Sequence, residues 1–306
     1  MVLDKVALTG ASGMLGRHVL AALAQAGINV AGASRTRPDI LGADDQWASW
    51  DLREWKTPDE LDALFGEAQA VIHLGAVVPA PGEAASRRDT FDANVRACLA
   101  LGEWATARNL PLVFISSATV YAAPEAAGIL ENAPQTRHGF GGFYGFSKVL
   151  AENVFENLRG EGLAAAILRP SSTYGAGLPS KKMLSGFLAT AEQDQTIELV
   201  PPINDRVDML HAADLAQAIL ATLRKQAWGT FNISSGHPAS IEEIARTCID
   251  VVGKGAVAVA PGANTERPAI TRFDLNPQAA RDQLAFAASI DLRRGIEMTW
   301  KNDLLV

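Results

Sequence analysis

Short apolar runs alternate with amphipathic stretches through the first half of the chain. The runs are brief and mostly rich in β-branched residues, which is typical of strands buried on both faces. They are VALTG (6–10), VAGAS (30–34), AVIHLGA (70–76), LVFISS (112–117) and AAILRP (165–170). Between them, residues 14–26, 86–107 and 145–160 show the spacing of amphipathic helices. This alternation predicts βαβ units and therefore an α/β fold, a doubly wound parallel sheet with helices on both faces.

The pattern becomes less regular after Tyr174, where loops rich in Pro, Gly and Asn separate the elements. GTFNISS (229–235) is still typical of a strand, and we expect it to return to the first sheet. The sequence thus predicts a first domain over 1–174 and a smaller C-terminal lobe that makes up most of 175–306. Open α/β sheets bind ligands at the carboxyl ends of their strands, so we expect the lobe to cover that edge and bind substrate.

Composition and charge narrow the kinds of partner. The net charge of −7 argues against nucleic acid or an anionic membrane surface as the main partner. The N-terminal segment lacks the features of a signal peptide, and no stretch approaches the length of a membrane span. Cys98 and Cys248 lack metal-ligand spacing, the five histidines form no cluster, and His73 lies on a predicted buried strand. We therefore expect free buried thiols, a packed His73, no metal and a cytoplasmic location.

Three glycines stand within seven residues where the first predicted strand meets the first predicted helix. TGASGMLG places them at Gly10, Gly13 and Gly16. Gly10 would allow a tight turn, Gly13 the close approach of a pyrophosphate, and Gly16 the close packing of helix on sheet. The helix N-terminus would offer free N–H groups and partial positive charge to the phosphates. The turn predicts a Rossmann-like dinucleotide-binding domain, and a glycine-rich turn without a ligand is the alternative.

The glycine spacing and six further segments resemble the extended short-chain dehydrogenase/reductase superfamily, and within it the NAD(P)-dependent epimerase/dehydratase family. The segments are FDANVRACLALGEWA, FISSATVYAAP, FYGFSKVLAE, LRPSSTYGAG, DMLHAADLAQAIL and GTFNISSG. They follow the family order over nearly the whole chain. The resemblance implies an NAD(P)-dependent oxidoreductase or epimerase that moves a hydride at a hydroxyl-bearing or carbonyl carbon of a sugar or sugar nucleotide.

Tyr144 and Lys148 are four residues apart, so on a helix they share one face. A nearby ammonium would lower the pKa of the phenol from about 10 and let Tyr144 exchange a proton with a substrate hydroxyl. The resemblance implies that Lys148 also holds the nicotinamide ribose, that Ser117 orients the reacting oxygen and that Asn94 supports a proton-relay water. Ser116 competes with Ser117 for that role, and a surface helix asparagine is an equal alternative for Asn94.

Ser34 ends the second predicted strand, where NAD-binding domains carry an acidic residue. No carboxylate is present there to repel a 2′-phosphate, and Arg35 could bind that phosphate through two hydrogen bonds, which favours NADP over NAD. The alternative is that Arg35 stacks on the adenine and NAD is used. The resemblance implies further cofactor contacts from Gly10, Ser12, Gly13, Met14, Leu15, Gly16, Asp51, Leu52, Leu74, Gly75, Ala76, Lys148 and Pro170.

Departures from the family pattern limit the choice of substrate. Ala118 and Thr119 stand where dehydratases of this branch carry an Asp-Glu pair, which disfavours elimination of water. Ser172 stands where sugar-nucleotide epimerases of this branch carry an asparagine. Val207 stands where the family carries an arginine, and the nearest arginine, Arg206, is one residue earlier. The expected substrate contacts are Val78, Thr119, Ser172, Arg206 and Arg267, the last matching a diphosphate-binding arginine.

Two other functions stay open, namely an NADPH-dependent reductase of a non-nucleotide carbonyl compound and a catalytically silent NAD(P)-binding sensor. The intact Ser117, Tyr144 and Lys148 speak against the sensor. The resemblance also implies a homodimer, formed through the helices that begin near Ala93 and Phe146. The apolar faces of these helices are wider than one core contact requires.

Overall fold

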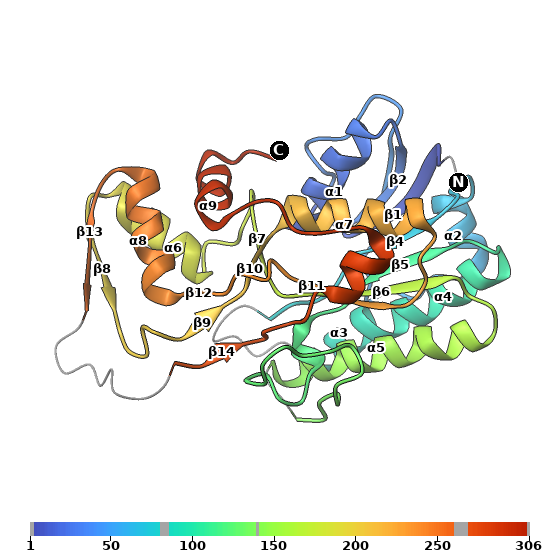
Figure 1. The fold of residues 1–306 in the computed structure, drawn as a ribbon. Coiled ribbons are helices and arrows are strands. Elements are labelled where there is room, and N and C mark those ends of the chain that lie inside the picture. Colours follow the sequence, from blue (N-terminus) through green and yellow to red (C-terminus); the bar gives the residue numbers. More distant parts are fainter. Residues whose placement is uncertain (1–2, 80–85, 139–140, 260–268, 305–306) are drawn as a thin grey trace.

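A computed structural model describes residues 3–79, 86–138, 141–259 and 269–304. The larger part of the fold is a seven-stranded sheet in which every neighbouring pair of strands is parallel (Figure 1). Its strands are β1 (Lys5–Thr9), β2 (Asn29–Ser34), β3 (Gln46–Ser49), β4 (Val71–His73), β5 (Leu112–Ile115), β6 (Ala165–Pro170) and β11 (Thr230–Ile233). Their order across the sheet is β11-β6-β5-β4-β1-β2-β3. The predicted doubly wound parallel sheet is confirmed.

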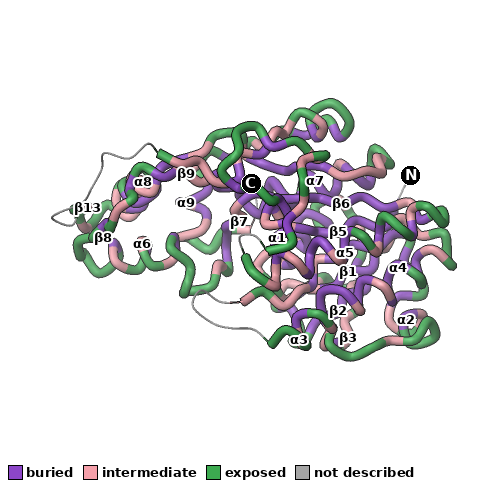
Figure 2. Tube along the Cα trace, turned by 90° about the horizontal axis from the view of Figure 1, so that it is seen from below, coloured by how far each residue is buried: buried purple, intermediate pink, exposed green. Residues whose placement is uncertain are grey.

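Helices cover both faces of this sheet. They are α1 (Met14–Gln25), α2 (Pro58–Phe65), α3 (Arg87–Phe91), α4 (Ala97–Ala107), α5 (Gly142–Gly160) and α7 (Ala212–Lys225). One apolar core joins α1 and α7 to the first face, and another joins α2, α4 and α5 to the second. Figure 2 shows the buried residues concentrated along the strands, with exposed residues on the outer sides of the helices. Burial on both faces explains why these strands are continuous apolar runs.

The structure differs from the sequence prediction at several places in this part, including β3 and the helix expected over 86–107. The short strand β3 was not predicted, because none of its four residues is buried and they form no apolar run. The single helix expected over 86–107 is divided into α3, a π-helical turn (Asp92–Arg96) and α4. The turn inserts an extra residue into the helical repeat, and it carries Asn94.

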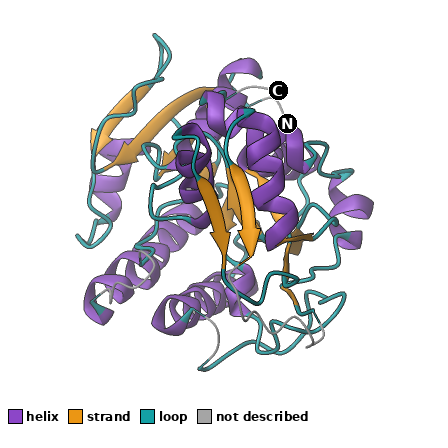
Figure 3. Cartoon of the chain, turned by 90° about the vertical axis from the view of Figure 1, so that its left-hand side faces the viewer, coloured by secondary structure: helices purple, strands orange, loops and turns teal. Residues whose placement is uncertain are grey.

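The smaller lobe has its own core and lies beyond the carboxyl ends of the parallel strands (Figures 1 and 3). It contains α6 (Met183–Glu192), β8 (Thr196–Leu199), β9 (Arg206–Val207), β12 (Ala239–Ser240), α8 (Ile241–Val252), β13 (Ala256–Val259), β14 (Thr271–Arg272) and α9 (Leu292–Lys301). The paired strands β7 (Ser172–Tyr174) and β10 (Met209–His211) link it to the sheet. The chain leaves the lobe to form β11 beside β6 and then returns.

Both cysteines are buried and free. Among the residues that the structure describes, none of the helices combines the length and apolarity that crossing a membrane requires. Over the same residues, no three His, Cys, Asp or Glu side chains come together in a group that could hold a metal ion.

Candidate active site

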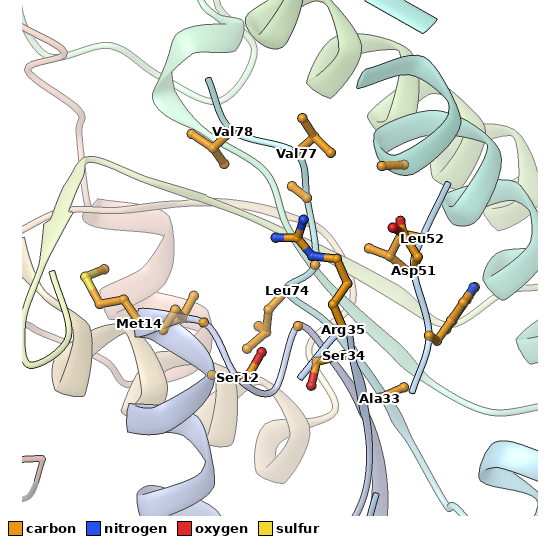
Figure 4. Close-up of a pocket in the computed structure, with 18 residues that line it drawn as sticks. Ser12, Met14, Ala33, Ser34, Arg35, Asp51, Leu52, Leu74, Val77 and Val78 are labelled. Atoms are coloured by element: carbon orange, nitrogen blue, oxygen red, sulfur yellow. The ribbon is translucent and has the colours of Figure 1, made fainter. Parts of the chain in front are cut away.

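A pocket of about 300 Å³ opens at the carboxyl ends of β1, β2 and β4 (Figure 4). Most of the residues expected to bind a cofactor line it, together with Val78, which we expected to contact substrate. The lining comprises Gly10, Ser12, Gly13, Met14, Leu15, Gly16, Ala33, Ser34, Arg35, Trp50, Asp51, Leu52, Leu74, Gly75, Ala76, Val77, Val78 and Ala93. Lys148 and Pro170 are not among its walls. Ala33, Trp50, Val77 and Ala93 are the members that sequence reasoning missed.

The three glycines of the turn serve three different geometries. Gly10 has φ of +73°, and a Cβ there would lie 2.7 Å from the backbone nitrogen of Gly75. A Cβ at Gly16 would lie 2.3 Å from the carbonyl oxygen of Gly10, so the helix packs directly on its own turn. Gly13 is the N-cap of α1, and no side chain caps the first N–H groups of this helix. A Cβ at Gly13 would have its nearest neighbour at 3.4 Å, which is an ordinary contact distance. The first N–H groups of the helix are therefore available to a ligand.

Asn94 fixes the pocket wall that follows β4. Its side-chain amide accepts a hydrogen bond from Val77 N (2.7 Å) and donates to Val77 O (3.0 Å). It also donates to Ser147 Oγ (3.0 Å), which in turn donates to the carbonyl oxygen of Tyr144 (2.7 Å). Asn94 is 1 % exposed, so the surface alternative is wrong. The Asn94 amide therefore connects the pocket wall at Val77 to Ser147 on α5, the helix that carries Tyr144.

His73 is a packed side chain, as expected. Its Nδ1 pairs with Thr9 Oγ1 (2.6 Å), and its Nε2 lies 3.3 Å from the Cys98 sulfur. Burial lowers the pKa of His73 to about 3, so the ring is neutral at physiological pH. The adjoining Gly75 and Ala76 line the pocket, which leaves His73 a structural role behind them.

The end of β2 presents a cation and no carboxylate. Arg35 is exposed and reaches into the pocket between the glycine turn and the segment that contains Val77 (Figure 4). The Ser34 hydroxyl donates to the carbonyl oxygen of Thr36 (2.7 Å) and accepts from Trp47 Nε1 (3.0 Å). The nearest acid on the lining, Asp51, is ion-paired with a neighbouring arginine, whose hydrogen bonds lower the pKa of that carboxyl group.

Tyr144 lies near Ser117 at the end of β5, close enough for the serine hydroxyl to act on the ionisation of the phenol. The Ser117 hydroxyl also accepts hydrogen bonds from Thr119 N (3.2 Å) and Thr119 Oγ1 (2.9 Å). Burial raises the pKa of Tyr144 to about 12, and the bond with Ser117 acts in the opposite direction. Ser116, the competing serine, points the other way and hydrogen-bonds the buried Glu152. The geometry thus groups Tyr144 with Ser117.

Lys148 shares a face of α5 with Tyr144, but its ammonium has a different partner from the one expected. Nζ donates to the carbonyl oxygen of Ile115 (2.8 Å) and lies 4.6 Å from the centre of the Phe114 ring. Burial lowers the pKa of Lys148 to about 8. In the protein alone burial raises the pKa of Tyr144 and the ammonium is held against the end of β5, so the expected lowering of that pKa by Lys148 stays a prediction.

A buried ion pair beneath the site was not predicted. Glu152 and Arg169 are 2 % and 6 % exposed, and their closest charged atoms lie 2.7 Å apart. Arg169 also donates to Tyr121 Oη (3.0 Å), and Glu152 accepts from Gln135 as well as from Ser116. The network fixes the ends of β5 and β6. Glu152 stands four residues after Lys148, but nothing in the local pattern marks its partner on another strand.

The expected substrate residues are dispersed. Arg206 donates twice to the carbonyl oxygen of Pro238 (2.7 and 3.0 Å) and forms an ion pair with Glu243 (3.2 Å), both within the lobe. Ser172 is half-buried at the start of β7. Arg267 lies outside the described residues. The structure therefore brings Thr119 to Ser117 and Val78 to the pocket, but it directs the Arg206 guanidinium into the lobe.

Comparison with known proteins shows the family and the fold. The profile of the NAD dependent epimerase/dehydratase family matches residues 6–234. The UDP-glucose 4-epimerase of Azospirillum brasilense is 27 % identical over 98 % of this chain and 92 % of its own. The dTDP-4-dehydro-6-deoxy-D-allose reductase of Streptomyces bikiniensis is 27 % identical over 91 % and 93 %. Thermus thermophilus UDP-glucose 4-epimerase, solved with NAD, shares the fold with a TM-score of 0.82, 19 % identity and coverage of 97 % and 98 %.

Proposed function

The chain belongs to the NAD-dependent epimerase/dehydratase family, and from this we propose that it transfers a hydride at a hydroxyl-bearing or carbonyl carbon of a sugar or sugar nucleotide. The observation that carries the proposal is that Ser117 and Tyr144 lie near each other at the end of β5, on a helix that Asn94 and Ser147 connect to the wall of the glycine-turn pocket. Relatives aligned along nearly the whole chain are named epimerases and reductases, which supports an enzyme. The Ala118–Thr119 pair disfavours a dehydratase.

The pocket suits the adenosine and diphosphate part of a nicotinamide dinucleotide. The backbones of Gly10 and Gly75 approach so closely that a side chain would fill the space between them, and the uncapped N-terminus of α1 offers N–H groups to a diphosphate. The glycine turn would hold the diphosphate, Asp51 and Leu52 the adenosine end, and Lys148 the second ribose. When bound, the cofactor supplies the hydride acceptor or donor.

The chain's own residues would handle the proton. Ser117 would donate a hydrogen bond to the reacting oxygen and orient it toward Tyr144. Tyr144 would exchange the proton of that oxygen. Its pKa of about 12 in the protein alone must fall for it to act as a base at neutral pH, and positive charge brought near the phenol has that effect. Lys148, with a pKa of about 8, remains mostly protonated at pH 7 and supplies part of that charge.

Tyr144→Phe tests this assignment. The variant should bind cofactor as the wild type does, because the ring still packs, and it should lose most turnover because the proton donor is gone. Nicotinamide absorbance with a panel of sugar nucleotides, sugars and carbonyl compounds measures turnover, and calorimetry measures cofactor binding. Wild-type turnover in the variant would refute the role of Tyr144. Cofactor binding by the wild type without turnover on any compound would favour the sensor.

We further propose a preference for NADP over NAD. Arg35 reaches into the pocket, Ser34 contributes no carboxylate, and the negative charge of Asp51 is already paired. A charge-assisted bond to a 2′-phosphate is worth about 1.5–3 kcal/mol, or roughly tenfold to a hundredfold in affinity. Arg35→Ala should lose most of this preference and leave NAD binding almost unchanged, and Ser34→Asp should shift it toward NAD. The NAD-bound Thermus relative is the argument against, and a wild type that prefers NAD would refute the proposal.

A second candidate function is favoured by Arg206. The Arg206 guanidinium is hydrogen-bonded to Pro238 O and ion-paired with Glu243. To bind a substrate diphosphate it would have to give up these contacts. This supports an NADPH-dependent reductase of a carbonyl compound without a nucleotide. Calorimetry with uridine diphosphate, added to the cofactor-bound protein, separates the two candidates. Binding favours the sugar nucleotide, and absence of binding favours the reductase.

We also propose a homodimer through α4 and α5. Phe146, Leu150 and Val154 follow one another at helical spacing on α5 and are half-buried rather than covered, and Phe143 stacks edge-on against Phe146 at 6.1 Å. Such a stripe is typical of a face that packs on a partner helix. Light scattering at micromolar concentration should give twice the chain mass, and Leu150→Glu should give the mass of one chain. A single-chain mass for the wild type would refute the dimer.

A further inference from the structure

Thr119 holds the Ser117 hydroxyl in a defined orientation. A serine hydroxyl has two acceptor lone pairs and one proton to donate. Thr119 N and Thr119 Oγ1 both donate to Ser117 Oγ, at 3.2 and 2.9 Å. With Thr119 Oγ1 as the donor both lone pairs are occupied, and the Ser117 proton is left for Tyr144 or for a substrate oxygen beside it.

The methyl side of Thr119 faces Gly141. A Cβ built on that glycine, at the start of α5, would lie 3.3 Å from both Cβ and Cγ2 of Thr119. A β-branched side chain has few χ1 rotamers, and placing the methyl against Gly141 leaves Oγ1 toward Ser117. Tyr144 lies three residues after Gly141, on the helix α5. The contact between Thr119 and Gly141 therefore positions Ser117 and Tyr144 relative to each other.

We propose that Thr119 is a positioning residue that makes Ser117 a hydrogen-bond donor, so that its one proton stabilises the ionised form of Tyr144 in the absence of substrate and polarises the reacting oxygen when substrate is bound. This rests on the proposed role of Ser117 and Tyr144 and assigns Thr119 an effect on the proton rather than on substrate recognition. It also gives a reason for threonine at this position, since its hydroxyl serves Ser117 while its methyl packs on α5.

The test is the ionisation of Tyr144, followed without any substrate. The chain has three tyrosines, so replacing them with a fluorinated, more acidic tyrosine gives three fluorine NMR signals, and Tyr144→Phe identifies the relevant one. Thr119→Val keeps the shape and removes the hydroxyl, Thr119→Ala is a second such variant, and Thr119→Ser restores the hydroxyl. Spectra are recorded against pH for the cofactor-bound protein, with circular dichroism to establish that each variant is folded.

Thr119→Val and Thr119→Ala should raise the pKa of the Tyr144 signal by up to about 0.7 of a pH unit, the equivalent of one neutral hydrogen bond. Thr119→Ser should titrate close to the wild type. The proposal is overturned if Thr119→Val titrates as the wild type does, or if Thr119→Ser shifts as far as Thr119→Val. A lack of turnover on every compound would count against the proposed function and would leave this titration unaffected.

Discussion

Alanine substitutions in the glycine turn should have different effects at two positions. At Gly16 we expect a loss of stability, and at Gly13 a loss of cofactor affinity. At Gly16, an added Cβ would lie 2.3 Å from Gly10 O and 2.4 Å from the Ala11 carbonyl oxygen. Ordinary contact begins at about 3.4 Å, so α1 must withdraw by about 1 Å from the turn that precedes it. Forced overpacking of this kind costs about 1–3 kcal/mol of unfolding free energy. Gly16→Ala should therefore be destabilised by that amount.

Gly13→Ala should behave in the opposite way. Its Cβ would meet Gly10 O at 3.4 Å, so the free protein accommodates it, and the stability should fall by about 1 kcal/mol, the typical cost of alanine at an N-cap. The same methyl would occupy the space through which a diphosphate approaches the N-terminus of α1. We expect cofactor affinity to fall by at least about tenfold, which is 1.4 kcal/mol.

Urea unfolding followed by circular dichroism measures the stability, and calorimetry with NAD and NADP measures the affinity. Gly160→Ala is a matched control, because the space around Gly160 near the end of α5 is open and its backbone is helical. That control should be neutral or slightly more stable, since alanine is the better helix former. A Gly13→Ala variant that binds both dinucleotides as tightly as the wild type would refute the assignment of this turn to the diphosphate.

Three further changes test the site and its support. Lys148→Ala should lower both turnover and cofactor affinity, since the proposed ribose contact is lost, and an unchanged affinity in calorimetry would count against that contact. Arg169→Met should lower the unfolding free energy by about 3–5 kcal/mol, because it leaves the buried carboxylate of Glu152 unpaired. The double variant with Glu152→Leu should recover much of that loss in urea unfolding, and failure to recover would show that the charge is not the cause. Burial lowers the pKa values of His18 and His211 to about 4 and about 3, below the 6.5 of the unfolded chain. The unfolded state therefore takes up protons first, so stability should fall as the pH drops below about 6.5, by up to about 1.4 kcal/mol per pH unit for each histidine. His18→Gln should make this dependence shallower, and an identical slope would refute its assignment to His18.

The sequence by itself determined the features that depend on neighbours along the chain. The five predicted strands of the first half are present because each is a continuous apolar run, which only burial on both faces of a sheet accommodates. The glycine turn was recognisable because Gly10, Gly13 and Gly16 act within one strand–turn–helix unit. Tyr144 and Lys148 share a helix face because their spacing is one helical turn.

Tertiary structure alone decided which partner each polar side chain meets. Asn94 could be placed on a helix from its sequence, but its role follows from Val77, which arrives from another segment. Lys148 binds the carbonyl oxygen of Ile115 because β5 ends against α5, and the Arg206 guanidinium lies in the lobe because β9 and the Pro238 segment pack together. Hydrogen bonds and ion pairs act over a few ångströms between residues far apart in the chain, so no local pattern encodes them, and only the packing of the elements selects among the possible partners.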